Sequence, residues 1–229
     1  MKKFTEMLSK KMEVSKSDSD FAFFFSLLVS AEALTKLIVL QMLASLEMDK
    51  DRHQYKILHK LVRASGIGDW SKAIDDLLIG TASQHLNIAF RPYQTEFTKK
   101  VPPDEWQNVA VHNLLKAMAV FELDNGKAKG KTDFKSWFKL FSEFRNKTRG
   151  HGTIPSAKAS IAAPYLEKSI VTILENLKLL TLPSAYLKKN LSGKYRVTPI
   201  SESADEFVEL KSSNGFQLED GVYIYWLIW

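Results

Sequence analysis

A short cationic segment with one histidine has the residue types needed for chemistry on a phosphate group. Within residues 143–152 the chain places Arg145, Asn146, Lys147, Arg149 and His151, with glycines on both sides of the histidine. An arginine guanidinium stays charged and matches two phosphate oxygens, while histidine titrates near neutral pH and can exchange a proton. The segment therefore predicts a site that binds a phosphate and moves a proton beside it.

The element that must position this segment is the helix that precedes it. Between Thr132 and Phe144, apolar residues recur at the three-and-four spacing of one helix face, namely Phe134, Trp137, Phe138, Phe141 and Phe144. Gly150 predicts the end of this helix, because glycine accepts the left-handed conformation of a C-terminal cap. On a continuous helix Arg145 and His151 would point roughly 240° apart. A helix end near Gly150 would let the chain turn and bring the two side chains together.

Composition and charge limit the classes of protein. The chain has 229 residues, 45% apolar residues, 10 glycines and 7 prolines, which indicates one domain of ordinary size with a smaller appendage. It has no cysteine, which excludes disulfides, thiol catalysis and cysteine-based zinc sites, and a reducing cytoplasmic setting is the simplest expectation. The net charge of +6 favours an anionic partner, with nucleic acid ahead of a membrane surface.

The most apolar segment, Phe21 to Met48, raises the question of a membrane span. Glu32 and Lys36 interrupt it, and a charge at the centre of a span costs about 2.5–3.5 kcal/mol. We therefore expect a buried core helix and no membrane partner, although a basic amphipathic protein on a membrane surface stays a third hypothesis. Glu32 and Lys36 lie four residues apart, hence on one helix face. They form either a half-buried ion pair or solvent-reaching side chains, or they line the active cleft near Arg145 and His151.

The pattern along the chain predicts a mainly α protein. Helices are expected in the segments Phe21–Met48, Asp49–Ser65, Asp69–Ile79, Pro102–Leu123, Thr132–Gly150 and Pro155–Pro183. Residues 1–16 form either a short polar helix or a loose arm, and 80–101 has no clear assignment. Strands are expected at Lys194–Thr198, Glu206–Leu210 and Val222–Trp229, with turn signals at Asn214-Gly215 and Asp220-Gly221. The predicted domains are a helical bundle over 1–183 and a small antiparallel β extension over 184–229. Because the chain ends within an apolar strand, we expect it to be cut from a longer protein.

The pattern Arg145-Asn146-x4-His151 resembles the defining motif of the HEPN superfamily, which is an arginine, a polar residue and a histidine after a short spacer. The resemblance covers roughly residues 18–182, where the motif lies between two long helices. It implies a HEPN-like helical bundle, an antiparallel homodimer or pseudo-dimer, and metal-independent cleavage of RNA at a composite site built from two copies of the motif. The frequency of toxins and antiviral effectors in this family implies a role in prokaryotic defence, with a regulatory or sensor partner.

The resemblance implies roles for particular residues. Arg145, Asn146 and His151 would be catalytic, and the residues expected to bind substrate are Lys147, Arg149, Glu32, Lys36 and Lys131. An alternative from another class is a catalytically silent HEPN-like module that dimerises and binds RNA or a protein. A second, looser match, Arg52-His53-x5-His59, is explained by the surface of a helix without any chemistry.

The histidines outside the motif are His53, His59, His85 and His112. Their spacing along the chain makes no metal site with nearby acidic residues. The sequence therefore predicts neither a metal nor another cofactor.

Overall fold

The fold is mainly α, with a small β unit after the helical body, as predicted. The computed structural model describes residues 2–50, 52–123, 130–149, 154–201, 204–211 and 217–225. Its α-helices are α1 (Lys2–Asp18), α2 (Asp20–Ala44), α3 (His53–Val62), α4 (Ile67–Leu78), α5 (Arg91–Thr98), α6 (Trp106–Val120), α7 (Lys135–Arg149) and α8 (Ser156–Asn176). Its 3-10 helices are η1 (Thr81–His85), η2 (Ile88–Phe90), η3 (Lys178–Thr181) and η4 (Ala204–Lys211).

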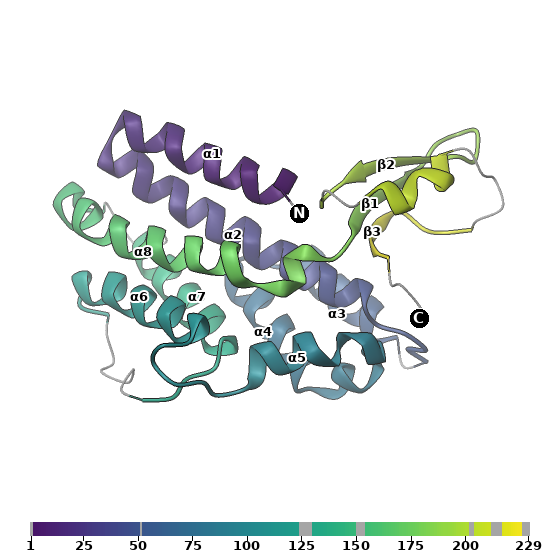
Figure 1. Cartoon of the computed structure of the whole chain (residues 1–229), viewed down its shortest axis with the longest axis horizontal. Helices are drawn as coiled ribbons and strands as arrows, with labels where there is room; N and C mark the ends of the chain where they lie inside the picture. The colour runs from purple at the N-terminus through teal and green to yellow at the C-terminus, as the bar shows by residue number, and fades with distance from the viewer. Residues whose placement is uncertain are drawn as a thin grey trace.

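Helix α2 is the central element of the helical body. It begins at a serine cap, where the Ser19 hydroxyl accepts a hydrogen bond from the Ala22 N–H at 3.1 Å. It packs against α1, α4 and α8 (Figure 1). By length and composition α2 could cross a membrane, but 67% of its most apolar stretch is buried inside the molecule. Its apolar sequence is therefore explained by core packing, as predicted.

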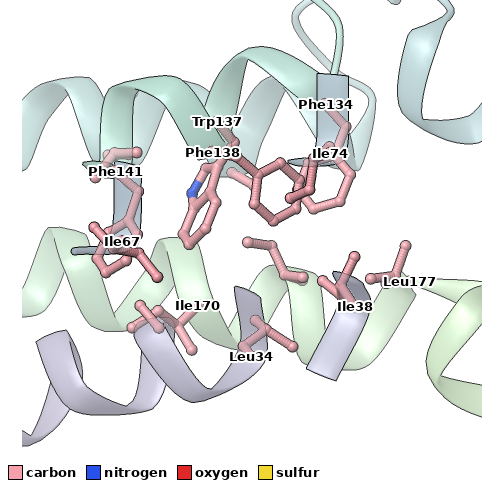
Figure 2. Packing of buried hydrophobic residues seen from close by; sticks show 14 of the residues in the cluster. Leu34, Ile38, Ile67, Ile74, Phe134, Trp137, Phe138, Phe141, Ile170 and Leu177 are labelled. Carbon is pink, nitrogen blue, oxygen red and sulfur yellow. The ribbon is translucent and has the colours of Figure 1, made fainter. Parts of the chain in front are cut away.

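Helix α7 carries the aromatic core that positions the cationic segment. The side chains at most 1% exposed include Phe134, Trp137, Phe138, Phe141 and Phe144. Figure 2 shows four of these residues, Phe134 just before the helix and Trp137, Phe138 and Phe141 on it, facing residues of α2, α4 and α8. The helix begins at Lys135, three residues later than predicted, because Thr132 pairs with Val101 in a backbone bridge. Its last described residue is Arg149, so the arginines of the motif lie on the helix itself.

The β unit differs from the prediction in two ways: strand β1 was not predicted, and one predicted strand is a helix. The sheet has the order β2-β1-β3, with β1 at Ser184–Lys189, β2 at Tyr195–Pro199 and β3 at Gly221–Ile224, all antiparallel. The prediction is confirmed for β2 and for the start of β3; residues 226–229 lie outside the described part. The predicted strand Glu206–Leu210 is wrong, because this segment is η4. Phe207 and Leu210 are both buried at a spacing of three, which is a helical period.

Candidate functional site

One carboxylate on α2 holds two arginines of α7. Glu32 Oε1 accepts from Arg145 Nε at 2.6 Å and from Arg149 Nη1 at 3.0 Å. The side chains of Glu32, Arg145 and Arg149 are 12%, 20% and 38% exposed. Arg145 and Arg149 lie four residues apart, so both project from one face of α7 toward α2. Two cations share one anion here, which leaves a net positive charge at the end of α7.

An aromatic contact also holds the end of α7. The Arg149 guanidinium lies over the Phe25 ring of α2, 5.0 Å from the ring centre. Such a cation–π contact contributes on the order of 0.5–1 kcal/mol at a partly exposed site. Glu32 and Phe25 together therefore restrict where the two guanidinium groups can lie.

Asn146 and Lys147 occupy the exposed side of the same helix turn. The Asn146 side-chain oxygen accepts a long hydrogen bond of 3.4 Å from Arg145 Nη1. Lys147 projects roughly 200° around the helix from Arg145. Its ammonium group therefore extends the positive charge outward, away from the Glu32 carboxylate.

His151 lies outside the described residues, within the segment 150–153. Helix α7 reaches Arg149 and the described chain resumes at Ile154, just before α8. The predicted helix end at Gly150 also lies outside the described residues. The meeting of the His151 imidazole with Arg145 stays a prediction.

Two further predicted substrate-binding lysines lie apart from this cluster. Lys36 Nζ lies 5.7 Å from the ring centre of Trp70 on α4, and among the described residues no ion pair joins Lys36 to Glu32. Glu32 pairs with α7 instead of with its neighbour on α2. Lys131 is exposed and lies four residues before the first residue of α7, and this start of the helix is about 15 Å along the axis from Arg145. The structure thus brings together Glu32, Arg145, Asn146 and Arg149 from the predicted set.

A cavity of about 570 Å³ lies beside α5 and the start of α6, and none of the motif arginines lines it. Its lining includes Tyr93, Glu96, Trp106 and Gln107. Glu96 Oε2 and Gln107 Oε1 have no hydrogen-bond partner within the described ranges. Burial raises the pKa of Glu96, and the nearby Lys178 charge and backbone N–H offset only part of this effect. The sequence did not predict this cavity, because the two acceptors, Glu96 on α5 and Gln107 on α6, belong to different helices and form no recognisable motif.

A group of potential metal ligands lies at the C-terminal end of α2. Asp49, His53 and His85 each offer one ligand atom, and these atoms lie within 4.8 Å of one another. The spacing of the histidines along the chain did not predict this grouping. His85 is 32 positions after His53 and reaches it only through the folded backbone.

Comparison with known proteins does not place the chain in a family. No protein-family model, no curated protein and no solved structure matches it. The functional argument therefore depends on the residues and their geometry.

Proposed function

We propose that this protein is a metal-independent endoribonuclease of the HEPN type, acting in prokaryotic antiviral defence or as a toxin. The observation that carries the proposal is the pairing of Arg145 and Arg149 with Glu32 at the end of α7. This pairing holds two phosphate-binding groups directly before the segment that contains His151. The order of these residues is the one that resembles the HEPN motif.

The proposed reaction uses the RNA's own 2′-hydroxyl as the nucleophile. One His151 takes the proton of the 2′-hydroxyl while the bond from this oxygen to phosphorus forms. The bond from phosphorus to the 5′-oxygen breaks, and His151 of the partner subunit protonates the leaving oxygen. The products are a 2′,3′-cyclic phosphate and a free 5′-hydroxyl. The Arg145 guanidinium stabilises the charge that develops on the phosphoryl oxygens.

In this proposal Glu32 is a positioning residue. Its carboxylate is engaged by the Nε atom of Arg145 and the Nη1 atom of Arg149. Arg145 Nη1 also donates a long hydrogen bond to Asn146, and the remaining guanidinium N–H groups can donate to phosphate oxygens. Asn146 and Lys147, exposed on the same turn, extend the surface that an RNA backbone would contact.

The composite site requires a second copy of the chain. The face of α2 beside Arg149 offers an apolar surface for this contact, because Phe21 and Phe25 are 44% and 37% exposed. Four residues separate them, so they share one helix face. A two-fold pairing across this face would bring two copies of the end of α7 toward each other.

One observation favours a second candidate, a silent HEPN-like module that dimerises and binds RNA or a protein. The Arg145 Nε atom and the Arg149 Nη1 atom are already paired with Glu32, which lowers the positive charge available to a phosphate. A module that only binds would tolerate this neutralisation. Cleavage and binding must therefore be measured separately.

The test is cleavage of a mixed RNA substrate in EDTA by the purified full chain. Arg145→Ala and His151→Ala are compared with Lys139→Ala, which alters an exposed lysine in the middle of α7. RNA binding is measured for all four proteins by fluorescence anisotropy. We expect cleavage by the parent and by Lys139→Ala, and a loss of at least 100-fold in the other two.

Each outcome decides between the candidates. Products with cyclic phosphate ends, lost in both site variants, support the nuclease. RNA binding without any cleavage by the parent supports the silent module. Cleavage that survives both Arg145→Ala and His151→Ala overturns the proposed site.

A further inference from the structure

We infer that Asp49, His53 and His85 form a binding site for a divalent transition-metal ion such as Zn²⁺. The three ligand atoms lie within 4.8 Å of one another. His53 Nδ1 lies 2.9 Å from Asp49 Oδ1, and the two imidazole rings are 5.0 Å apart between their centres. Two imidazoles and one carboxylate are a ligand set that suits zinc and its neighbours in the first transition row.

The fold brings these residues together through backbone hydrogen bonds between distant segments. Leu46 and Leu86 form an isolated antiparallel bridge. Next to it, the Glu47 N–H donates to the His85 carbonyl at 2.7 Å, and the Asn87 N–H donates to the Ser45 carbonyl at 2.8 Å. The loop after α2 is thus tied to the end of η1, which sets His85 beside the start of α3.

The carboxylate is held in a defined orientation. Asp49 Oδ2 accepts from the Gln54 N–H at 2.7 Å, while Oδ1 faces the His53 ring. The loop that carries Asp49 contains two non-glycine residues with left-handed backbone, Met48 at φ 47° and Arg52 at φ 56°. Such residues are uncommon and cost on the order of 1 kcal/mol each. The surrounding structure therefore holds Met48 and Arg52 in this conformation, and one Asp49 carboxylate oxygen faces the His53 ring.

The distances suit a metal ion after a small adjustment. Zinc bonds to histidine nitrogen and carboxylate oxygen are about 2.0–2.2 Å long, so neighbouring ligand atoms in a tetrahedral site lie about 3.3–3.6 Å apart. The Asp49 Oδ1–His53 Nδ1 distance of 2.9 Å is about 0.4 Å shorter than this range, and the three ligand atoms lie within 4.8 Å of one another. Small rotations of the His53 and His85 side chains would bring all three to these distances. Three protein ligands leave a fourth position for water.

The site is separate from the arginine cluster. Glu32 lies twelve residues before the end of α2, roughly 18 Å along its axis. A second cavity lies between α3 and α4. Neither this cavity nor the one beside α5 is lined by Asp49, His53 or His85. We therefore assign the ion a structural role, in which it clips the loop after α2 to the η1 segment.

The test uses the untagged full chain, freed of metal by EDTA and dialysis, and titrated with Zn²⁺ by calorimetry. His53→Ala, His85→Ala and Asp49→Asn are compared with His112→Ala, which removes an exposed histidine of α6. Asp49→Asn keeps an oxygen that can accept from the Gln54 N–H. This variant therefore removes the charged metal ligand while preserving the hydrogen bond that holds the loop. Circular dichroism in EDTA establishes that each variant is folded before titration.

We expect one Zn²⁺ per chain, and a rise in Tm of about 5 °C when Zn²⁺ exceeds its dissociation constant about 100-fold. Affinity should fall at least tenfold in each ligand variant and stay unchanged in His112→Ala. Co²⁺ should give the visible absorption of a four-coordinate ion, lost in the same variants. An absence of saturable Zn²⁺ binding, or binding that survives His85→Ala and His53→Ala, overturns the inference.

Discussion

At the scale of single residues, Glu32 affects both the proposed site and the stability of the fold. Its carboxylate is the shared acceptor of Arg145 and Arg149, and all three side chains are at least partly withdrawn from water. An unpaired guanidinium in such a place loses both its partner and its fixed orientation. Glu32 therefore links the stability of the α2–α7 contact to the geometry of the proposed active site.

We predict that Glu32→Gln lowers both RNA cleavage and stability. Removing the charge should let Arg145 move from its position, and a displacement of about 1 Å can cost on the order of 100-fold in rate. We expect a 10- to 100-fold fall in kcat with RNA affinity unchanged or higher, because one negative charge is gone. The free energy of unfolding should fall by about 1–2 kcal/mol. Single-turnover cleavage and urea unfolding measure the two effects.

The control for this variant is Glu175→Gln, which changes an exposed glutamate on α8. It alters the net charge by the same amount without touching the arginines. Equal cleavage by Glu32→Gln and Glu175→Gln would contradict the positioning role.

Glu96 provides a prediction about pH. Burial raises the pKa of this carboxyl in the folded state, so the folded protein holds the proton more tightly than the unfolded chain. Ionisation of Glu96 therefore costs stability as the pH rises above the unfolded value of about 4.3 and through the raised folded pKa. Glu96→Gln should be more stable than the parent at pH 7, and this gain should disappear near pH 4.

The measurement is urea unfolding of both proteins at pH 7 and at pH 4. Glutamine keeps a carbonyl oxygen for the Lys178 backbone N–H, so the comparison isolates the charge. A variant that is less stable than the parent at pH 7 would show that the Glu96 carboxylate is favourably paired in the folded protein.

At the scale of elements, a buried serine connects three helices. Trp137 Nε1 on α7 donates to Ser169 Oγ on α8 at 2.8 Å, and this hydroxyl donates to the Ala110 carbonyl on α6 at 2.7 Å. Ser30 on α2 is equally buried, but its hydroxyl has no hydrogen-bond partner in the described part of the chain. The two serines form a matched pair for measuring what a buried hydroxyl contributes.

We predict that Ser169→Ala destabilises the protein by about 1–3 kcal/mol, because it leaves the Trp137 N–H buried without an acceptor. Ser30→Ala should change the free energy of unfolding by less than about 0.5 kcal/mol, or stabilise the protein slightly, since it removes a polar atom that has no partner. Chemical unfolding curves with a common slope give both values. A similar loss in the two variants would contradict the role of the hydrogen-bonded link.

A comparison of the predicted and observed elements shows which parts of the fold could be predicted from the sequence. The aromatic row of α7 has strict helical spacing, and its helix and burial are both confirmed. The apolar run of α2 is confirmed as a buried helix. Strand β1 was not predicted, because Ser184–Lys189 lies just after Pro183 and its apolar residues are consecutive and do not alternate. η4 was mistaken for a strand because a short segment with two large apolar residues fits either period.

The candidate site was only partly predictable. The arginines and Glu32 were singled out from residue type, and their contact joins positions more than 110 apart in the chain. The grouping of Asp49, His53 and His85 could not be predicted, because it depends on the bridge between Leu46 and Leu86. The spacing of residues along a chain predicts which side chains share a face of one helix or strand. It does not predict a backbone bridge between distant segments such as this one.

At the scale of the whole molecule, the proposed chemistry depends on the surface around the end of α7. Arg149 lies over Phe25, and the partly exposed Phe21 lies one helix turn away on α2. A positive site that borders an exposed aromatic stripe is the arrangement expected where two copies share one RNA linkage. Contact between copies would remove the stripe from water and place two sets of arginines near each other.

We predict that Phe21→Asp separates the copies and lowers cleavage while leaving the fold intact. Phe21 is in the first turn of α2, where an aspartate favours the helix dipole and no helix break is expected. Light scattering should give twice 26.1 kDa for the parent and 26.1 kDa for the variant. Cleavage per chain should fall at least tenfold, because each monomer would hold half of the composite site.

Ile161→Asp, which places the same charge at an exposed apolar position of α8, should remain dimeric and active. A parent protein that cleaves RNA as a monomer, or a Phe21→Asp variant that stays dimeric and active, would rule out this face of α2 as the contact between copies.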